Sequence, residues 1–312
     1  MKNSSVSILV LGSNGLVGSA LCRGLELRGY KDFLVPKRQE LDLLDQKAVF
    51  EYLNHYRPQW IFLAAAKVGG IMANSTYPAE FIHQNLTIAS NVIHGAYLAK
   101  CEKLLFLGSS CIYPKNPPIP IKEEYLLTGP LEKTNEAYAV SKIAGLKMAE
   151  FYRQQYGCNF FSVMPTNLYG PKDRYHPDNS HVIPGLIERF VQAYEKKLEM
   201  VKVWGTGNPL REFLHVDDLA SGLIFLMNSE KKCDGLINIG SGEEISIRDL
   251  SQLIVKKVNY KGKIEFDSSK PDGTMRKLLD SSKIRDLGWK PSISLEQGLE
   301  ETIQAYIADH RI

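Results

Sequence analysis

The segment Val6-Ser-Ile-Leu-Val-Leu-Gly12-Ser-Asn-Gly15-Leu-Val-Gly18 sets the architecture expected for this 312-residue chain. Its first half is a short apolar run, which is typical of a buried parallel strand. The glycines allow a sharp turn into an amphipathic stretch, residues 16–28, and Gly29 follows at the position that glycine favours after a helix. A strand, a glycine-rich turn and a helix in this order direct backbone N–H groups at a ligand. The segment therefore predicts a binding site for the pyrophosphate of a dinucleotide.

The alternation of strands and helices continues to about residue 166. We expect further strands at residues 31–36, 60–65, 103–107 and 160–164, and helices at 47–55, 78–100 and 136–156. This order predicts an α/β fold with a doubly wound parallel Rossmann sheet. Beyond residue 166 the chain is rich in Pro, Gly, Asp and His, which indicates a smaller C-terminal substrate-binding domain. We expect residues 1–166 and 214–238 to form the dinucleotide-binding Rossmann domain, and 167–213 and 239–312 the substrate-binding domain.

The composition is ordinary for a soluble globular protein, with 44% hydrophobic residues, 23% charged residues and a net charge of +3. The basic residues are scattered, so no nucleic-acid partner is indicated. The five cysteines are widely spaced and odd in number, which argues against a disulfide framework and a metal cluster. No signal peptide precedes the first strand, and no apolar run approaches the roughly 18 residues of a membrane span. We expect a cytoplasmic protein that binds neither metal nor membrane.

The second expected strand ends in Pro36-Lys37-Arg38, which bears on the choice of cofactor. An NAD site usually places Asp or Glu there to bind the ribose 2′-hydroxyl. A guanidinium can instead hold a 2′-phosphate with two hydrogen bonds, so the basic pair favours NADP(H). Two solvated surface cations are the alternative. Asp42 and the small residues Ala64-Ala65-Ala66 are weaker indications of the same site.

Tyr138-Ala-Val-Ser-Lys142 places a phenol and an ammonium on one face of an expected helix. An ammonium beside a phenol lowers the phenol pKa, which makes Tyr138 a candidate proton donor to a carbonyl oxygen. Ser109 lies at the carboxyl end of the fourth expected strand, where ligands of doubly wound sheets bind. Ser109, Tyr138 and Lys142 in this order form a dehydrogenase triad. The Tyr–Lys spacing alone could also belong to a solvated helix face.

Cys111 and His181 indicate a second kind of chemistry. Cys111 follows Ser109 by two residues, and His181 follows a loop rich in charge and proline. A thiol and an imidazole at one site can remove and return protons at carbons next to a ketone. A buried structural thiol and a loop histidine with structural partners are the alternatives.

Over nearly its whole length the chain resembles the GDP-L-fucose synthase family of extended short-chain dehydrogenases. The resemblance is carried, in chain order, by residues 12–18, 107–114, 138–142, 164–171, 180–184, 204–207, 211–218, 270–274 and 276–277. Ser-Ser-Cys at 109–111 and Ser-His-Val-Ile-Pro at 180–184 separate this family from other sugar-nucleotide dehydrogenases. Members convert GDP-4-keto-6-deoxy-D-mannose to GDP-L-fucose with NADPH, by 3,5-epimerisation followed by 4-keto reduction. A homodimer is also implied.

The resemblance implies a role for each matching residue. Cys111 and His181 would exchange the protons on C3 and C5, with base and acid unassigned, and Tyr138 would protonate O4 during hydride transfer to C4. Cofactor contacts are implied for Gly12, Ser13, Asn14, Gly15, Leu16, Val17, Gly18, Arg38, Leu107, Gly108, Ser109, Ser110, Lys142, Pro165, Thr166, Asn167, Leu168 and His181. Substrate contacts are implied for Arg189, Trp204, Arg211, Asp272 and Lys277.

Two alternatives remain, and one departure from the family bears on the cofactor. Where a bacterial branch carries arginine in the glycine loop, this chain has Asn14, so NADP preference rests on Lys37 and Arg38. Another nucleotide-sugar epimerase or reductase is the nearest alternative, but a 4,6-dehydratase would have Thr-Asp-Glu where this chain has Ser110-Cys111-Ile112. A non-catalytic NADP-sensing Rossmann protein is the other, and the complete triad disfavours it.

Overall fold

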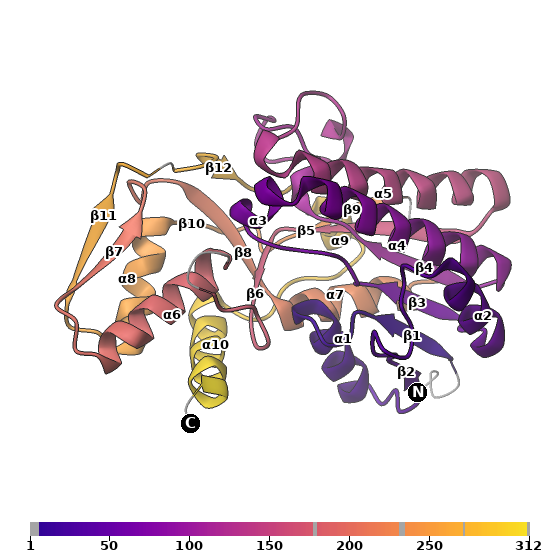
Figure 1. The fold of residues 1–312 in the computed structure, drawn as a ribbon, viewed down its shortest axis with the longest axis horizontal. Helices are drawn as coiled ribbons and strands as arrows, with labels where there is room; N and C mark the ends of the chain where they lie inside the picture. Colours follow the sequence, from indigo (N-terminus) through magenta and orange to yellow (C-terminus); the bar gives the residue numbers. More distant parts are fainter. Residues whose placement is uncertain (1–5, 177–179, 231–234, 271, 311–312) are drawn as a thin grey trace.

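A six-stranded parallel sheet forms the centre of the computed structural model, which describes residues 6–176, 180–230, 235–270 and 272–310 (Figure 1). Its strands, in spatial order, are β2 (Phe33–Leu34), β1 (Ile8–Leu11), β3 (Trp60–Leu63), β4 (Lys103–Leu107), β5 (Asn159–Pro165) and β9 (Leu236–Ile239). The chain leaves β1 for β2 on one side and returns to β3 on the other. Ligands of such sheets bind at the carboxyl ends of the strands, beside this reversal. The predicted doubly wound Rossmann fold is confirmed.

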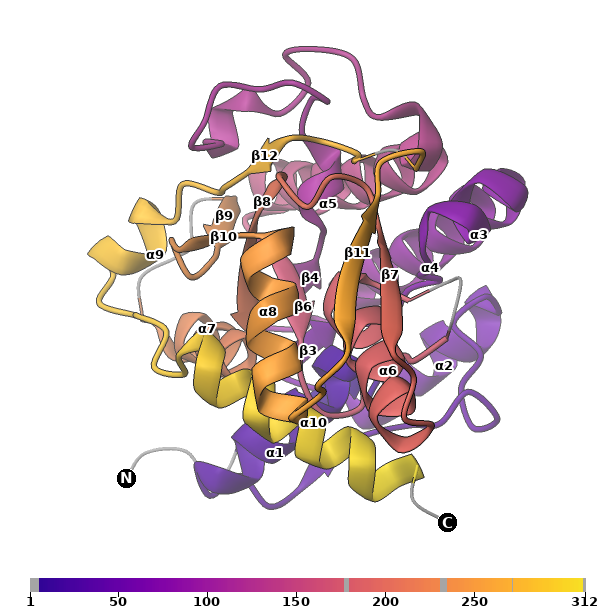
Figure 2. The same ribbon diagram turned by 90° about the vertical axis from the view of Figure 1, so that its left-hand side faces the viewer.

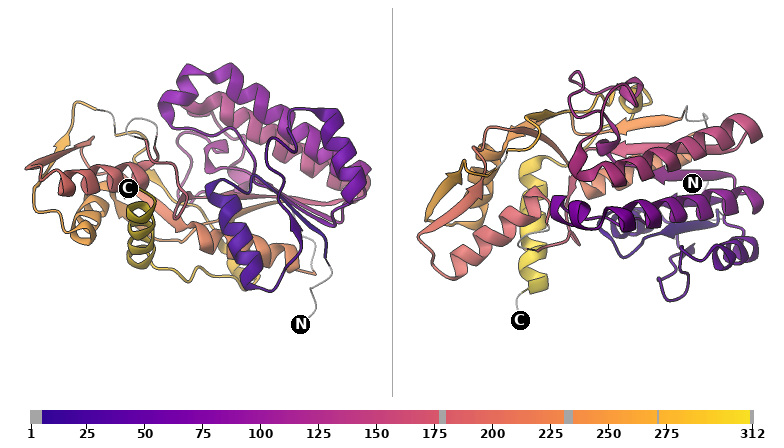
Figure 3. Two further views of the ribbon diagram at one scale, coloured as in Figure 1. Left: turned by 60° about the horizontal axis from the view of Figure 1, so that its bottom comes forward. Right: turned by 45° about the horizontal axis from the view of Figure 1, so that its top comes forward.

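Helices cover both faces of the sheet, which explains why its strands are apolar at nearly every position. One face carries α1 (Leu16–Leu27) and α7 (Val216–Asn228), and the other α2 (Gln46–Tyr56), α4 (Pro78–Leu98) and α5 (Glu136–Tyr156) (Figures 1 and 3). Along β1, Ile8 and Val10 face the first layer, while Leu9 and Leu11 face the second. Each strand therefore contributes to two hydrophobic cores.

The helices and strands of this larger unit follow the predicted positions closely. Gly29 after α1 has φ +82°, as the glycine position after a helix requires. The second strand is the exception, because β2 lies at the sheet edge, pairs only with β1 and is only half-buried. The short helix α3 (Ile71–Thr76), between β3 and α4, was not predicted.

A smaller unit lies beyond the carboxyl edge of the sheet (Figure 2). Its central strand β8 (Leu210–His215) pairs with β6 (Asn167–Tyr169), β10 (Glu244–Ser246) and β12 (Arg276–Lys277), and a second ladder joins β7 (Met200–Trp204) to β11 (Lys263–Asp267). Helices α6 (Val182–Glu195), α8 (Ile247–Val258) and α10 (Leu295–His310) pack against these strands around Phe190, Leu250 and Tyr306. The helices and strands of this unit are harder to predict from sequence than those of the larger unit, because its strands are short and its loops are long.

The two units share segments of chain. After β8, helix α7 and strand β9 return to the larger sheet. The segment around α9 (Ser282–Asp286), within the range predicted for the smaller domain, packs in the core beneath α7 through Ile284 and Trp289. The Trp289 indole donates a hydrogen bond to Ser221 on α7 at 2.9 Å. In the part of the chain that the structure describes, no helix is long and apolar enough to cross a membrane.

Candidate active site

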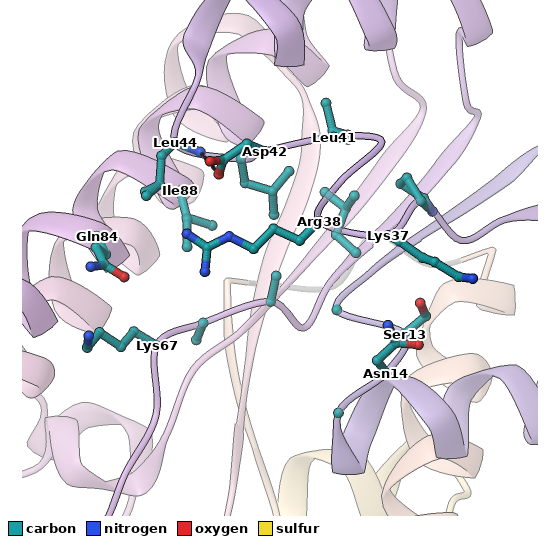
Figure 4. Close-up of a pocket in the computed structure, with 17 residues that line it drawn as sticks. Ser13, Asn14, Lys37, Arg38, Leu41, Asp42, Leu44, Lys67, Gln84 and Ile88 are labelled. Atoms are coloured by element: carbon teal, nitrogen blue, oxygen red, sulfur yellow. Dashed lines mark hydrogen bonds between the residues drawn. The ribbon is translucent and has the colours of Figure 1, made fainter. Parts of the chain in front are cut away.

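A cavity of about 350 Å³ opens at the carboxyl ends of β1 and β3, beside the reversal of strand order (Figure 4). The glycine turn forms one wall with Ser13 and Asn14, and Arg38 extends into the cavity from the segment after β2 (Figure 4). Gly12, Gly15 and Lys37 also line the cavity. The structure therefore brings the predicted glycine turn and the predicted basic pair to one cleft.

Gly12, Gly15 and Gly18 are glycines for two different reasons. Gly12 has φ +92°, and a Cβ there would lie 2.7 Å from the backbone nitrogen of Ala65. A Cβ at Gly18 would lie 2.0 Å from the Gly12 oxygen, so both positions are needed by the turn itself. At Gly15 the nearest atom to a Cβ is 3.5 Å away, which is ordinary contact. Packing within the chain does not require glycine at position 15, but a ligand close to the backbone would.

The N-terminus of α1 is chemically suited to an anion. Gly15 caps α1 without a side-chain hydrogen bond, and the first turn contains no acidic residue. Its backbone N–H groups and the positive end of the helix dipole are therefore available to a phosphate. Lys37 and Arg38 add positive charge at the same cavity. The carboxylate of Asp42, which also lines it, accepts a hydrogen bond from the Leu44 backbone at 3.1 Å. The cavity thus fits the phosphate groups of a dinucleotide.

The other predicted cofactor residues lie around this cavity rather than on its wall. Leu16, Val17 and Gly18 belong to α1, whereas residues 107–110 and 165–168 lie at the carboxyl ends of β4 and β5, further along the same sheet edge. The sequence interpretation missed five lining residues: Leu11 at the end of β1, Leu41 in the segment after β2, Lys67, which follows β3, and Gln84 and Ile88, which lie on α4. For Lys67 the sequence signal is its place after the third strand. No pattern marks Gln84 and Ile88, because the packing of α4 decides which of its side chains face the cavity.

Ser109, Cys111, Tyr138 and Lys142 converge at the carboxyl end of β4. The Ser109 hydroxyl caps a single 3₁₀ turn, Ser110–Ile112, by accepting a hydrogen bond from the Cys111 backbone N–H at 3.5 Å. The same hydroxyl lies near the Tyr138 hydroxyl and the Cys111 thiol and lowers the pKa of both. Lys142 lies one turn beyond Tyr138 on α5, with its Nζ 5.8 Å from the centre of the phenol ring. The structure therefore brings together four of the five predicted catalytic residues.

The expected lowering of the Tyr138 pKa does not appear in this structure. Burial raises the pKa of Tyr138 well above its usual range, the neighbouring Cys111 adds to the rise, and the Ser109 hydrogen bond opposes it. Lys142 directs its ammonium at the Leu107 carbonyl oxygen, 2.7 Å away, and burial lowers the Lys142 pKa to about 8. Desolvation thus outweighs the neighbouring ammonium. Tyr138 holds its proton, as a proton donor must.

Desolvation raises the pKa of Cys111 and lowers that of His181. Burial raises the pKa of the Cys111 thiol, although the Ser109 hydrogen bond and the Lys277 and Lys142 charges oppose the rise. His181 begins α6 and is open to solvent on one side, but the protein around it lowers its pKa by desolvation. In the described part of the chain, no hydrogen bond or ion pair joins His181 to Cys111 or Tyr138. The structure does not bring this predicted pair into contact.

Two cations lie side by side next to Cys111. Lys277 on β12 pairs in register with Arg211 on β8. Burial lowers the pKa of both side chains, and the Arg211 charge lowers the pKa of Lys277 further, while Cys111 opposes that shift. Like charges held together repel each other, so an anion bound between them would stabilise the arrangement. The pair therefore forms a candidate anion site beside the catalytic cluster.

The remaining predicted substrate residues, Arg189, Trp204 and Asp272, lie around the end of β7 and the loop that follows it. Trp204 is 50% exposed, and the Arg189 guanidinium lies 5.4 Å from its ring centre. Asp272 accepts hydrogen bonds from the backbone and the hydroxyl of Thr206, at 2.7 and 2.8 Å. These bonds hold the loop after β7 against the segment before β12. An exposed indole beside a cation offers a flat surface for stacking.

Comparison with known proteins agrees with this architecture. Residues 8–240 match the NAD dependent epimerase/dehydratase family. The chain belongs to this family. The matched range begins at the start of β1 and ends one residue after β9, so it includes every strand of the parallel sheet.

Individual members of the epimerase/dehydratase family are similar over nearly the full chain. GDP-L-fucose synthase 1 of Arabidopsis thaliana is 53% identical over 309 residues, which cover 98% of this chain and 95% of the relative. GDP-L-fucose synthase of Escherichia coli (strain K12) is 51% identical over 312 residues, 97% of each chain. A solved structure of a GDP-L-fucose synthetase from Naegleria fowleri bound to NADP has a TM-score of 0.91 and 29% identity, with 99% of this chain and 96% of that chain covered.

The glycine turn generates a test that separates ligand binding from folding. Gly15→Ala should weaken NADPH binding at least about tenfold, because the methyl group occupies the ligand side, while costing about 1 kcal/mol as a poorer helix cap. Gly18→Ala should lower the free energy of unfolding more than Gly15→Ala, because its methyl group meets backbone. NADPH fluorescence titration and urea unfolding measure the two effects. Equal effects of both variants on both measurements would contradict this division.

Proposed function

We propose that this chain is an NADPH-dependent oxidoreductase with epimerase activity that converts GDP-4-keto-6-deoxy-D-mannose to GDP-L-fucose. The observation that carries the proposal is a proton-donor cluster, Ser109, Tyr138 and Lys142, placed near enough to the thiol of Cys111 for that group to shift the pKa of both Tyr138 and Lys142. Relatives that are 51–53% identical over nearly the whole chain are named GDP-L-fucose synthase. A plain dehydrogenase needs no thiol next to its tyrosine.

The cofactor assignment follows from the fit of the cleft. The glycine turn and the N-terminus of α1 would hold the pyrophosphate, and Lys37 with Arg38 the 2′-phosphate. Leu107, Ser110, Lys142 and residues 165–168 would contact the nicotinamide half. When bound, NADPH supplies the hydride for C4. Residues 1–166 and 214–238 would thus serve the cofactor, and 167–213 and 239–312 the sugar nucleotide.

Epimerisation is assigned to Cys111 and His181. The C4 ketone makes the hydrogens on C3 and C5 acidic, so a base can remove each proton and an acid can return one to the opposite face. Cys111 is supported by its place beside Tyr138, with Lys277 and Lys142 nearby to stabilise a thiolate. His181 is supported by the matching Ser-His-Val-Ile-Pro segment, and its lowered pKa leaves a neutral imidazole that can accept a proton. Together the two residues could remove a proton from the sugar carbon and return a proton to its opposite face.

Reduction is assigned to Tyr138, assisted by Ser109 and Lys142. The buried phenol keeps its proton until O4 of the substrate gains negative charge, and then donates it. Ser109 bonds the phenol hydroxyl and would orient O4 beside it. The ammonium of Lys142 would stabilise the resulting phenolate. Reduction removes the ketone that made C3 and C5 acidic, so it must follow epimerisation and ends the sequence.

Arg211 and Lys277 are assigned to the diphosphate of the substrate. The exposed face of Trp204, together with Arg189, is assigned to the nucleoside or the sugar. Asp272 would order the loop that carries Trp204 through its bonds to Thr206. A diphosphate carries the negative charge that the adjacent cations require. The distribution of charge therefore agrees with a GDP-sugar.

We further propose that the chain forms a homodimer through the outer surface of α4 and α5. The side chains of Leu98, Phe151 and Tyr156 are each about half exposed there, at 54%, 55% and 47%. Helices α4 and α5 pack against each other, so apolar side chains on their outer surfaces can contribute to one contact surface. Light scattering should give twice the mass of one chain, and Phe151→Lys should shift it towards the monomer. A wild-type monomer at micromolar concentration would reject the proposal.

Isotope exchange distinguishes the two halves of the reaction. In deuterated water with GDP-4-keto-6-deoxy-D-mannose, Tyr138→Phe should still introduce deuterium at C3 and C5 but reduce NADPH oxidation by about a hundredfold or more, because it lacks the O4 proton donor. Cys111→Ser should lose the exchange as well. Mass spectrometry follows deuterium, and absorbance at 340 nm follows NADPH. Exchange that survives Cys111→Ser at the wild-type rate would remove the thiol from the mechanism.

The basic pair can be tested against the choice of cofactor. Arg38→Ala should raise the KM for NADPH about tenfold or more and leave the KM for NADH nearly unchanged, because only NADPH carries the 2′-phosphate. Lys31→Ala, an exposed lysine before β2, is the matched control and should change neither value. Steady-state kinetics with both cofactors give the comparison. A parallel loss with NADH would show that Arg38 does not read the 2′-phosphate.

A further inference from the structure

The proposed function gives no role to the most deeply buried carboxylate beside its substrate residues. Glu212 follows Arg211 on β8 and is fully buried. Burying a carboxylate costs free energy unless hydrogen bonds compensate for the lost water. Desolvation raises the pKa of Glu212, and bonds from Gly242, Leu279 and Thr166 oppose the rise. The desolvation free energy of this buried carboxylate suggests that Glu212 has a specific structural role.

The two carboxylate oxygens of Glu212 hold two different segments. The Gly242 backbone N–H donates to Oε1 at 2.7 Å, and the Leu279 backbone N–H donates to Oε2 at 3.1 Å. The carboxylate also packs against Gly240: a Cβ atom at position 240 would lie only 2.2 Å from Oε1 of Glu212. Glu212 therefore joins the loop after β9 to the segment after β12.

The main-chain oxygen of Glu212 holds a third segment. Thr166, which joins β5 to β6, and Asn167, the first residue of β6, donate side-chain hydrogen bonds to it at 3.3 and 2.9 Å. These residues are assigned to the nicotinamide side of the site. One residue thus connects the sheet, the cofactor side and the strand that carries Lys277.

The ladder that holds Lys277 is short. Strand β12 pairs with β8 only at Arg276–Leu210 and Lys277–Arg211. Glu212 is the next residue of β8, and its carboxylate continues the attachment through Leu279. On its other side this segment bonds Ile121, whose N–H donates to the Leu278 oxygen at 2.8 Å. Two further contacts hold the segment: the Arg276 guanidinium binds the Glu244 carboxylate at 2.6 and 2.9 Å, and the Asp280 N–H donates to the Ile121 oxygen at 2.8 Å. The bond from Leu279 to Glu212 is the one that ties the segment to the residue next to Arg211.

The side chain of Lys277 has little to hold it by itself. Across the described ranges of the chain, its ammonium makes no hydrogen bond or ion pair, and Arg211 beside it repels it. The Arg211 guanidinium is oriented by the Leu210 oxygen at 2.8 Å. The backbone anchor at Leu279 is therefore one of the bonds that keep two repelling cations adjacent, and it is the one that Glu212 provides.

We propose that Glu212 is a positioning residue that holds Lys277 beside Arg211 and so forms the anion site for the diphosphate of the sugar nucleotide. The identity of the anion rests on the proposed function. The carboxylate acts through geometry: two acceptor oxygens satisfy two backbone donors that no neutral side chain of this size can satisfy together. A glutamine has one acceptor oxygen and would turn an NH₂ group towards the other N–H.

The test compares Glu212→Gln and Glu212→Asp with Glu243→Gln, an exposed acid in the next loop whose loss changes the net charge equally. Glu212→Gln should weaken GDP binding and raise the sugar-nucleotide KM about tenfold, with kcat and NADPH binding much less affected. Glu212→Asp keeps both acceptors and should recover part of the loss. Glu243→Gln should behave as wild type. Calorimetry with GDP, NADPH fluorescence and steady-state kinetics supply the readouts.

A double-mutant cycle with Lys277→Ala shows whether Glu212 acts through Lys277. Each single variant should weaken GDP binding, and Glu212→Gln should add little once Lys277 is absent. Additive losses, or unchanged GDP binding in a folded Glu212→Gln, would overturn the proposal. Should Glu212→Gln not fold, the same cycle with Glu212→Asp decides. A wild type that binds GDP without converting the keto sugar would reject only the proposed function, whereas one that binds no GDP would reject both.

Discussion

Parallel pairing of the six sheet strands is the constraint on which the site depends. All carboxyl ends lie along one edge because the strands are parallel. Helices cover both faces of the sheet, so the loops that leave this edge are the ones that can meet a ligand. The glycine turn leaves after β1, the basic pair after β2, Lys67 after β3 and Cys111 after β4. The smaller unit covers the same edge and adds Arg211 and Lys277. Catalytic and binding groups from distant parts of the chain are thus brought to one edge of the sheet.

Desolvation governs the electrostatics of this cleft. It is the largest cause of the pKa shifts of Tyr138, Cys111, Lys142 and Lys277, and it moves each group towards its neutral form. A phenol and a thiol that keep their protons stand next to amines that can lose theirs. The phenol and the thiol are therefore the neutral groups of the site, and Lys142, Lys277 and Arg211 are its cations. Negative charge would develop there only as protons move, and the nearby cations would stabilise it.

Most of the larger unit could be predicted because its signals are local. Apolar runs, helical periods and a glycine turn recur in order, and helix α5 spans the residues expected for it, Glu136–Tyr156. Prediction was weaker where packing between distant segments decides. The edge strand β2 is shorter than its apolar pattern indicated. Gln84 and Ile88 line the cofactor cleft only because α4 lies against it, and no motif marks them.

Local sequence was sufficient to name the chemical groups of this protein and the order of its βα units, because residue type and period are properties of neighbouring residues. Tyr138, Cys111 and the basic pair could be recognised in this way. The protonation states of Tyr138 and Lys142, the contact of Lys277 with Arg211, and the burial of Glu212 arose only in the folded chain. Desolvation and Coulomb energies depend on distances in space, and those distances join segments more than sixty residues apart, as with Glu212 and Leu279.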